Sequence, residues 1–153
     1  MRSGRAIWQS SARTGPSDRR LARVIVLDAS AVIAVFYPAD PHHERATKLL
    51  EHAAAGGFAV HPMTLAESLV GAAKGGRLNQ LRRQIHNMGI TVFAPEEDEP
   101  LLIAEIRANT GLKLPDCCVL AAALSLSSPL MTFDEKLGAC AREQSIGVVD
   151  SID

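Results

Sequence analysis

The feature that most constrains the fold of this chain is a short run of β-branched and aliphatic residues at positions 24–27, Val-Ile-Val-Leu, which Asp28 follows directly. An apolar run without polar alternation is typical of a strand that is buried on both faces, as in a parallel sheet. Similar short runs predict four more strands, at residues 58–60, 90–93, 130–132 and 147–149. The segments between the runs are long enough to contain helices.

Helical patterns fill these intervening segments. Apolar residues at helical spacing, with glycine or proline at the ends, predict helices over residues 30–37, 43–55, 64–74, 77–88, 96–111, 114–125 and 134–144. We expect Thr64 to cap its helix, with Glu67 completing a capping box, and the acidic residues 96–99 to fill the first turn of their helix. Because strands that alternate with helices are joined by right-handed crossovers, the predicted fold is α/β, a three-layer α/β/α sandwich with a central parallel β-sheet.

Charge divides the chain into two parts. The chain has 16 Lys and Arg against 17 Asp and Glu, but residues 1–23 hold six arginines and a single acid. Their net charge is +5, and that of the remaining residues is −6. We expect residues 1–23 to be a disordered basic extension: a transit peptide, a vector-derived sequence or the product of an upstream start codon. Residues 24–150 are expected to form a single domain.

Composition disfavours several classes of protein. No apolar run approaches the roughly 20 residues that span a bilayer, so we expect no membrane insertion. Three cysteines without CxxC spacing do not suit a disulfide scaffold, which favours a reduced, cytoplasmic location. The five histidines show no metal-ligand spacing, and no glycine-rich dinucleotide or P-loop motif occurs.

Four acidic residues are placed to meet at one edge of the predicted sheet. Asp28 and Asp134 follow the first and fourth strands, and Glu67 and Asp116 lie near helix starts, which belong to the same edge. Taken singly, each acid has a structural explanation as a helix cap or as a partner of the helix dipole. Taken together, they form an oxygen-only ligand set, which suits a hard cation such as Mg²⁺ or Mn²⁺.

These acids lie in short motifs, which occur in this order along the chain: Leu27-Asp28-Ala-Ser30, Ala66-Glu67-Ser, Pro115-Asp116 and Thr132-Phe-Asp134. The order and spacing of the motifs resemble PIN-domain nucleases, and most of all the VapC-type ribonuclease toxins of prokaryotic toxin–antitoxin pairs. The resemblance covers about residues 24–150. The chain departs from the family pattern at Phe133, where relatives often have a small polar or basic residue.

The resemblance implies a function and a role for each residue. It implies a Mg²⁺- or Mn²⁺-dependent endoribonuclease that leaves 5′-phosphate and 3′-hydroxyl ends on its RNA substrate, is inhibited by a cognate antitoxin and forms a homodimer. Divalent ions held by carboxylates neutralise a phosphodiester, lower the pKa of a bound water and stabilise the leaving oxygen. The implied catalytic and metal-binding residues are Asp28 and Asp116, completed by Glu67 and Asp134, with Ser30 and Thr132 orienting a ligand or water.

An acidic site needs a basic surface to hold RNA. The candidate residues are Lys74, Arg77, Arg82 and Arg83, around helix 77–88, although a solvated helix face has the same pattern. The alternative to a nuclease is a catalytically weak PIN-like module that binds RNA or a partner without cleavage. Phosphotransfer domains are disfavoured, because the first strand leads into Asp-Ala-Ser instead of Asp-x-Asp and Lys136 lies on a predicted helix.

Overall fold

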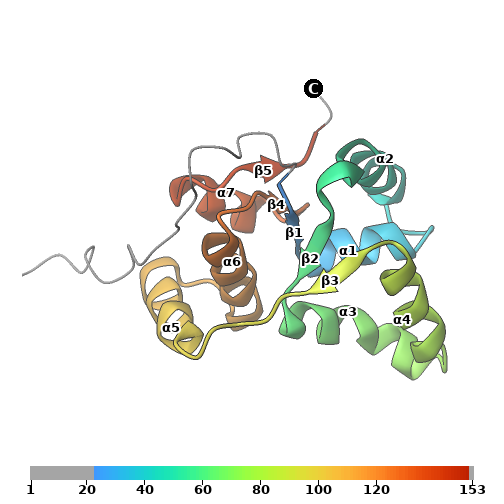
Figure 1. Cartoon of the computed structure of the whole chain (residues 1–153), viewed down its shortest axis with the longest axis horizontal. Helices are drawn as coiled ribbons and strands as arrows, with labels where there is room; N and C mark the ends of the chain where they lie inside the picture. The colour runs from blue at the N-terminus through green and yellow to red at the C-terminus, as the bar shows by residue number, and fades with distance from the viewer. Residues whose placement is uncertain (1–22, 152–153) are drawn as a thin grey trace, which may run out of the picture.

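The computed structural model describes residues 23–151, so nearly all of the extension predicted at residues 1–23 lies outside the described part of the chain. Five parallel strands form one sheet in the order β3-β2-β1-β4-β5 (Figure 1). The strands are β1 (Ile25–Leu27), β2 (Phe58–Val60), β3 (Ile90–Val92), β4 (Leu130–Met131) and β5 (Val148–Val149). All five predicted strands are confirmed, each to within about one residue at its ends.

Helices join these strands in the predicted alternation. Within the described residues they are α1 (Ala29–Phe36), α2 (His43–Ala53), α3 (Pro62–Lys74), α4 (Leu78–Asn87), α5 (Glu99–Thr110), α6 (Leu114–Leu126) and α7 (Glu135–Glu143). A short 3₁₀ turn, η2 (Ala54–Gly56), leads from α2 into β2. Gly111 ends α5 in the left-handed conformation, with φ of 66°, which glycine adopts without steric cost. No helix within residues 23–151 has the length and apolarity needed to cross a membrane.

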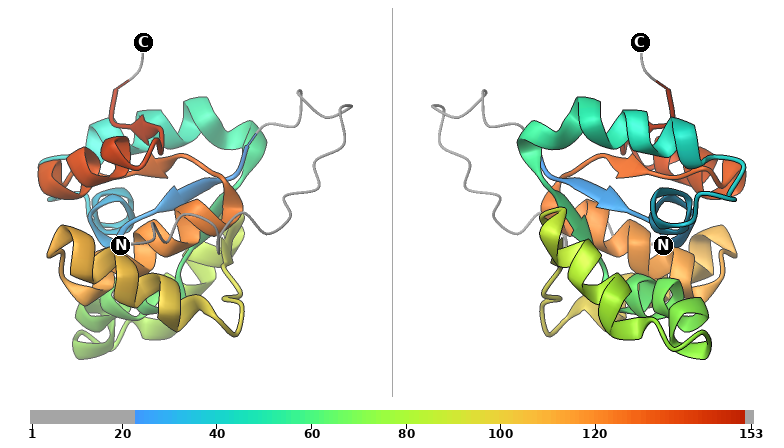
Figure 2. Two further views of the ribbon diagram at one scale, coloured as in Figure 1. Left: turned by 90° about the vertical axis from the view of Figure 1, so that its left-hand side faces the viewer. Right: turned by 90° about the vertical axis from the view of Figure 1, so that its right-hand side faces the viewer.

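The sheet separates two hydrophobic cores, and β1 contributes to both of them. Ile25 and Leu27 belong to a core shared with α1, α2, α3 and α4, whereas Val26 belongs to a core shared with α5, α6 and α7. This division follows from the alternation of side chains along a strand. Views from two sides show the sheet between its covering helices (Figure 2). The predicted three-layer α/β/α sandwich around a parallel sheet is therefore confirmed.

The predicted cap of α3 is wrong. The helix begins at Pro62, and its cap is His61, whose Nδ1 accepts a hydrogen bond from the Met63 N–H at 3.0 Å. Proline is favoured at the first helical position, because its missing N–H would have had no partner there. Thr64 is instead fully buried, and its Oγ1 has no hydrogen-bond partner among the described residues.

The predicted start of α5 is also wrong. The helix begins at Glu99, so the acids at 96–98 precede it instead of occupying its first turn. Pro100 is tolerated only in the first turn of a helix, which limits how early α5 can begin. Glu99 is therefore the single acid of that turn, and its side chain is buried.

Candidate active site

Asp28 is the centre of the candidate site. It follows β1 directly, and only 4% of its surface is exposed. Its Oδ1 accepts hydrogen bonds from the Ser30 hydroxyl at 2.7 Å and from the Ala31 N–H at 2.9 Å, and its Oδ2 accepts one from the Thr132 hydroxyl at 2.6 Å. The bond from Ala31 makes Asp28 the N-cap of α1. The capping explanation is thus correct for this residue, but it involves only one of the two carboxylate oxygens.

Burial raises the pKa of Asp28 above its usual value, because the charged carboxylate loses its hydration. The hydrogen bonds from Thr132, Ser30 and Ala31 favour the charged form and oppose this rise, and the negative charge of Asp116 adds to it. The net direction is upward. A bound cation would offset both the loss of hydration and the repulsion between the two carboxylates.

Two hydroxyl groups connect the end of β1 to the segment that follows β4. Besides donating to Asp28, the Thr132 Oγ1 accepts a hydrogen bond from the Asp134 N–H at 3.0 Å. The Ser30 Oγ likewise accepts a hydrogen bond from the Phe133 N–H at 3.0 Å. Ser30 and Thr132 are therefore placed to orient the Asp28 carboxylate.

Asp116 and Asp134 approach the site from the starts of two helices. Asp134 is the N-cap of α7, because its Oδ1 accepts a hydrogen bond from the Leu137 N–H at 2.9 Å. Asp116 lies half-buried in the first turn of α6. Burial raises the pKa of Asp116, and the charge of Asp134 raises it further. Asp28, Asp116 and Asp134 thus form a series of carboxylates in which each repels the next.

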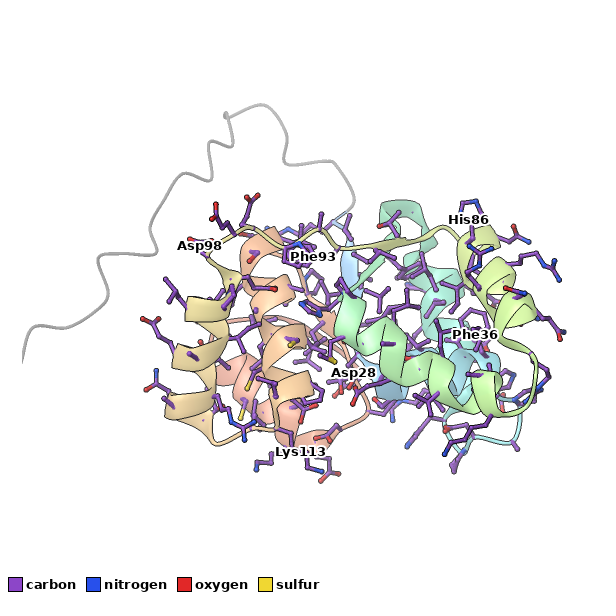
Figure 3. The ribbon with its side chains drawn as sticks, turned by 90° about the horizontal axis from the view of Figure 1, so that it is seen from below. Asp28, Phe36, His86, Phe93, Asp98 and Lys113 are labelled. Atoms are coloured by element: carbon purple, nitrogen blue, oxygen red, sulfur yellow. The ribbon has the colours of Figure 1, made fainter. Side chains whose placement is uncertain are left out.

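Two lysines that were not predicted as site residues lie beside this series of carboxylates. Lys113, immediately before α6, and Lys136, on α7, both lower the pKa of Asp116 through their positive charge. Both lysines are exposed. Figure 3 shows Asp28 between α6 and α3, with Lys113 near the start of α6. The signal that could have identified Lys113 is its place just before a helix that opens with Leu-Pro-Asp.

Glu67 is less closely associated with the other acids. Since α3 begins at Pro62, Glu67 lies in the second turn of that helix, where it is exposed. Helix α3 contacts α6, and the charge of Glu67 contributes to the pKa of the Cys118 thiol, which burial above all raises to about 11. Within the described residues no hydrogen bond joins Glu67 to Asp28, Asp116 or Asp134. The structure therefore places Asp28 near Asp116 and Asp116 near Asp134, and it leaves the fourth predicted acid on a neighbouring helix.

The donors of this site suit a hard divalent cation. All of them are oxygens, and within residues 23–151 none of the four acids is part of an ion pair. The Oδ2 of Asp28 accepts a single hydrogen bond and so retains a free lone pair. In the same part of the chain, no three Asp, Glu, His or Cys side chains stand close enough to hold one ion together. Three of the acids could therefore hold one cation only if their carboxylates moved closer together. A bound cation would make this possible, because it neutralises the charges that repel one another.

The predicted RNA-binding residues lie on α3 and α4. Lys74 is the last residue of α3, Arg77 precedes α4, and Arg82 and Arg83 lie on α4 itself. All four side chains are exposed. Among the described residues, none of them is hydrogen-bonded or ion-paired to the acids. Their role in binding RNA stays a prediction.

One buried polar pair at the same edge of the sheet was not predicted. His61, which follows β2, and Glu99, at the start of α5, are 6% and 8% exposed. Because the Nδ1 of His61 accepts the Met63 N–H, the ring proton lies on Nε2, which donates to the two Glu99 oxygens at 3.1 and 3.2 Å. The pair joins the starts of α3 and α5. Two residues this far apart in the sequence form no periodic pattern that would have indicated it.

Known structures share the fold of this chain. A toxin–antitoxin complex from Klebsiella pneumoniae contains a chain that is 26% identical, with a TM-score of 0.67, over 82% of this chain and 95% of that one. VapBC2 from Rickettsia felis, bound to a promoter DNA fragment, matches at 14% identity and a TM-score of 0.65, over 82% of this chain and 97% of its own. FitAcB from Neisseria gonorrhoeae matches at 21% identity and a TM-score of 0.62, over 82% and 96%. The last two likenesses concern the fold alone.

No curated protein matches the chain, but a family model does. The model described as PIN domain matches residues 25–143, which begin in β1 and end at the last residue of α7. This span contains all four acids and both hydroxyl residues of the candidate site. The chain therefore belongs to the PIN-domain family.

Proposed function

We propose that this protein is a Mg²⁺- or Mn²⁺-dependent endoribonuclease that hydrolyses RNA phosphodiester bonds. The observation that carries the proposal is the series of neighbouring carboxylates Asp28, Asp116 and Asp134 at the carboxyl edge of the sheet, none of which has an ion-pair partner among the described residues. Membership of the PIN family supports nuclease activity. A module that only binds has no need for carboxylates whose pKa values are raised by burial and mutual repulsion, so catalysis is favoured over the non-cleaving alternative.

The proposed division of work among the acids follows their burial. Asp28 and Asp116, the two with raised pKa values, would hold the cation directly, and Asp134 and Glu67 would complete its oxygen ligands. Such a cation supplies charge neutralisation to the phosphodiester and lowers the pKa of a water. The Thr132 hydroxyl keeps the Asp28 carboxylate oriented, because it donates to one of its oxygens.

Partners are proposed from the same comparisons. We infer that a cognate antitoxin inhibits this protein, because the 26% identical chain from K. pneumoniae belongs to a toxin–antitoxin complex. We also propose a homodimer, as the resemblance to VapC-type toxins implies.

The RNA substrate would also find positive charge near the acids. Lys113 and Lys136 would contact its phosphates there.

The deciding experiment compares cleavage of single-stranded RNA by the wild type and by Asp28→Asn, with Mg²⁺, with Mn²⁺ and with EDTA. Loss of a residue that only orients a metal ligand costs about 10–100-fold, so we expect loss of Asp28 itself to cost at least about a hundredfold. Glu143→Gln, an exposed acid on α7, is the matched control and should cleave like the wild type. Equal cleavage by the wild type and Asp28→Asn, or none by either, would contradict the proposal.

Metal binding can be tested separately from cleavage. At a concentration a hundred times its Kd, a cation that binds only the folded state should raise the free energy of unfolding by about 2.7 kcal/mol. We expect this stabilisation by Mg²⁺ or Mn²⁺ in the wild type and in Glu143→Gln, and not in Asp28→Asn. Calcium or EDTA in the same denaturation assay shows whether the effect is specific.

A further inference from the structure

A stacked pair of rings lies beside the candidate site, at the residue where the motif departs from the family pattern. Phe133 is half-buried, and the ring of His42 lies against it with centroids 4.7 Å apart and an angle of 4° between the planes. Arg45, on the first turn of α2, places its guanidinium carbon 5.4 Å from the centroid of the Phe133 ring. We call these three side chains, His42, Arg45 and Phe133, the His42 platform.

The exposed members of the platform are held in place by the backbone. The His42 N–H donates to Asp40 Oδ1 at 2.8 Å, and the His42 carbonyl accepts the Ala46 N–H at 2.8 Å. Arg45 donates to the main-chain carbonyl of Asp150, beyond the end of β5. The hydrogen bonds of His42 fix its main chain, stacking on Phe133 orients its ring, and the bond to Asp150 restrains the Arg45 side chain. These restraints reduce the conformational entropy that a ligand would otherwise have to remove.

The platform is attached to the centre of the candidate site. The Phe133 N–H donates to the Ser30 Oγ, which in turn donates to the Asp28 carboxylate. In Figure 2 the turn that joins α1 to α2, and thus carries His42, lies at the end of the molecule toward which β1 points. That end is the carboxyl edge, where the acids are. His42 is exposed, and its ring stacks on Phe133 through one face, so the opposite face is the one that a ligand would contact.

We infer that the His42 platform binds a base of single-stranded RNA next to the phosphate that is cleaved. The base stacks on the outer face of His42, and Arg45 contacts the phosphate of the same strand. The inference rests on the proposed function and adds to it the residues that hold the substrate. A flat, fixed and exposed ring is what base stacking requires, and stacking accepts any base, because every base has a π face. A guanidinium group beside it contacts phosphate oxygens.

Electrostatics favour a nucleic acid over an apolar partner at this place. Residues 24–153 carry a net charge of −6, and the site itself is a group of carboxylates, so an RNA strand needs nearby contacts that outweigh repulsion. Arg45 supplies positive charge on the α2 side of the acids, as Lys113 and Lys136 do on the side of α6 and α7. An exposed imidazole next to a guanidinium presents polar and cationic groups, whereas protein-docking patches are recognised by contiguous apolar surface.

The test measures binding without cleavage. Each variant is made in the full chain in the Asp28→Asn background, and the Kd for a fluorescein-labelled single-stranded RNA of mixed sequence is measured by anisotropy. Loss of one stacked base should weaken binding about fivefold to a hundredfold in His42→Ala, and His42→Tyr should restore it to within about threefold. Arg45→Ala should weaken binding and reduce the slope of log K against log salt by about one, while His42→Ala leaves that slope unchanged.

The matched control is His52→Ala, which removes another exposed imidazole, in the last turn of α2. It should bind RNA as its parent does, and circular dichroism should show that every variant is folded. A His42→Ala protein that binds RNA as tightly as His52→Ala overturns the inference, whatever it does to the binding of protein partners. Failure of the inference and failure of the proposed function can be told apart. If RNA binds through His42 but the wild-type chain never cleaves it, the platform is supported and the nuclease proposal is contradicted. If a His42→Ala chain that retains Asp28 cleaves RNA as fast as the wild type does, the nuclease proposal is supported and the platform is contradicted.

Discussion

The Thr132 hydroxyl makes two of the contacts that hold the candidate site together, and Thr132→Val tests their strength. Valine has nearly the same shape but lacks the hydroxyl, so the variant loses the 2.6 Å hydrogen bond to Asp28 and the acceptor of the Asp134 N–H. A hydrogen bond to a charged group contributes about 1.5–3 kcal/mol. Because Asp134 is exposed, its N–H can bond to water instead. We therefore expect the free energy of unfolding to fall by about 1.5–3 kcal/mol at neutral pH.

The loss should depend on pH in a defined direction. Burial holds the pKa of folded Asp28 above its usual value of 3.8, so the stability that this group contributes falls as the pH rises through the folded-state pKa. The hydrogen bond from Thr132 opposes that rise. Without it the pKa of Asp28 is higher still, so the variant is destabilised most where Asp28 is charged. The difference between wild type and variant should shrink as the pH falls and Asp28 becomes protonated in both.

Urea denaturation across about pH 5 to 8 measures this difference, with Thr132→Ser as the matched control. Serine keeps the hydroxyl and removes one buried methyl group, which costs about 1 kcal/mol at every pH. In an Asp28→Asn background the effect of Thr132→Val should also shrink, because a shared partner couples the two sites. If Thr132→Val were as stable as Thr132→Ser at neutral pH, the proposed role of the hydroxyl would be refuted.

Three further outcomes are expected. Glu99→Ala leaves the buried His61 N–H without an acceptor and should lower the free energy of unfolding in urea by about 1–3 kcal/mol, whereas exposed Glu96→Ala should change it by less than about 0.5 kcal/mol. Equal effects of the two substitutions would contradict the buried pair. Gly111→Ala forces a side chain into a backbone φ of 66° and should cost about 1–2 kcal/mol in thermal unfolding, and an unchanged midpoint would mean that α5 ends differently. Burial raises the pKa of Cys118 from 9.0 to about 11, so its thiolate is about a hundredfold scarcer at neutral pH, and iodoacetamide should label it at least that much more slowly in the folded chain than in urea.

The fold was predictable because its three central strands, β1, β2 and β4, are short and buried on both faces. A strand between two layers of helices has no polar side, so each one stands out as an apolar run against the amphipathic helices around it. The errors lie at helix starts, where alternative caps compete locally. Thr64 and Glu67 match a capping box, but Pro62 favours a start two residues earlier, and His61 then provides the cap.

The candidate site was predictable only as far as topology determines it. Asp28 and Asp134 follow strand ends and Asp116 begins a helix, so the parallel sheet brings all three to one edge. Side-chain pairs between distant elements leave no such pattern. The stacking of His42 on Phe133 depends on how the α1–α2 turn passes over the segment after β4, and the sequence spacing of the two residues carries no record of it.

The three residues of β1 have a consequence for how the molecule unfolds. Ile25 and Leu27 belong to one core and Val26 to the other, and the strand pairs with β2 on one side and β4 on the other. Without β1, neither half of the chain therefore has a complete hydrophobic core. Loss of β1 would expose apolar surface on both faces at once, which couples the halves into one cooperative unit. A fragment that ends after α4 would retain β1 but leave Val26 and the β4 side of the strand uncovered, and so should not persist as an independently folded piece.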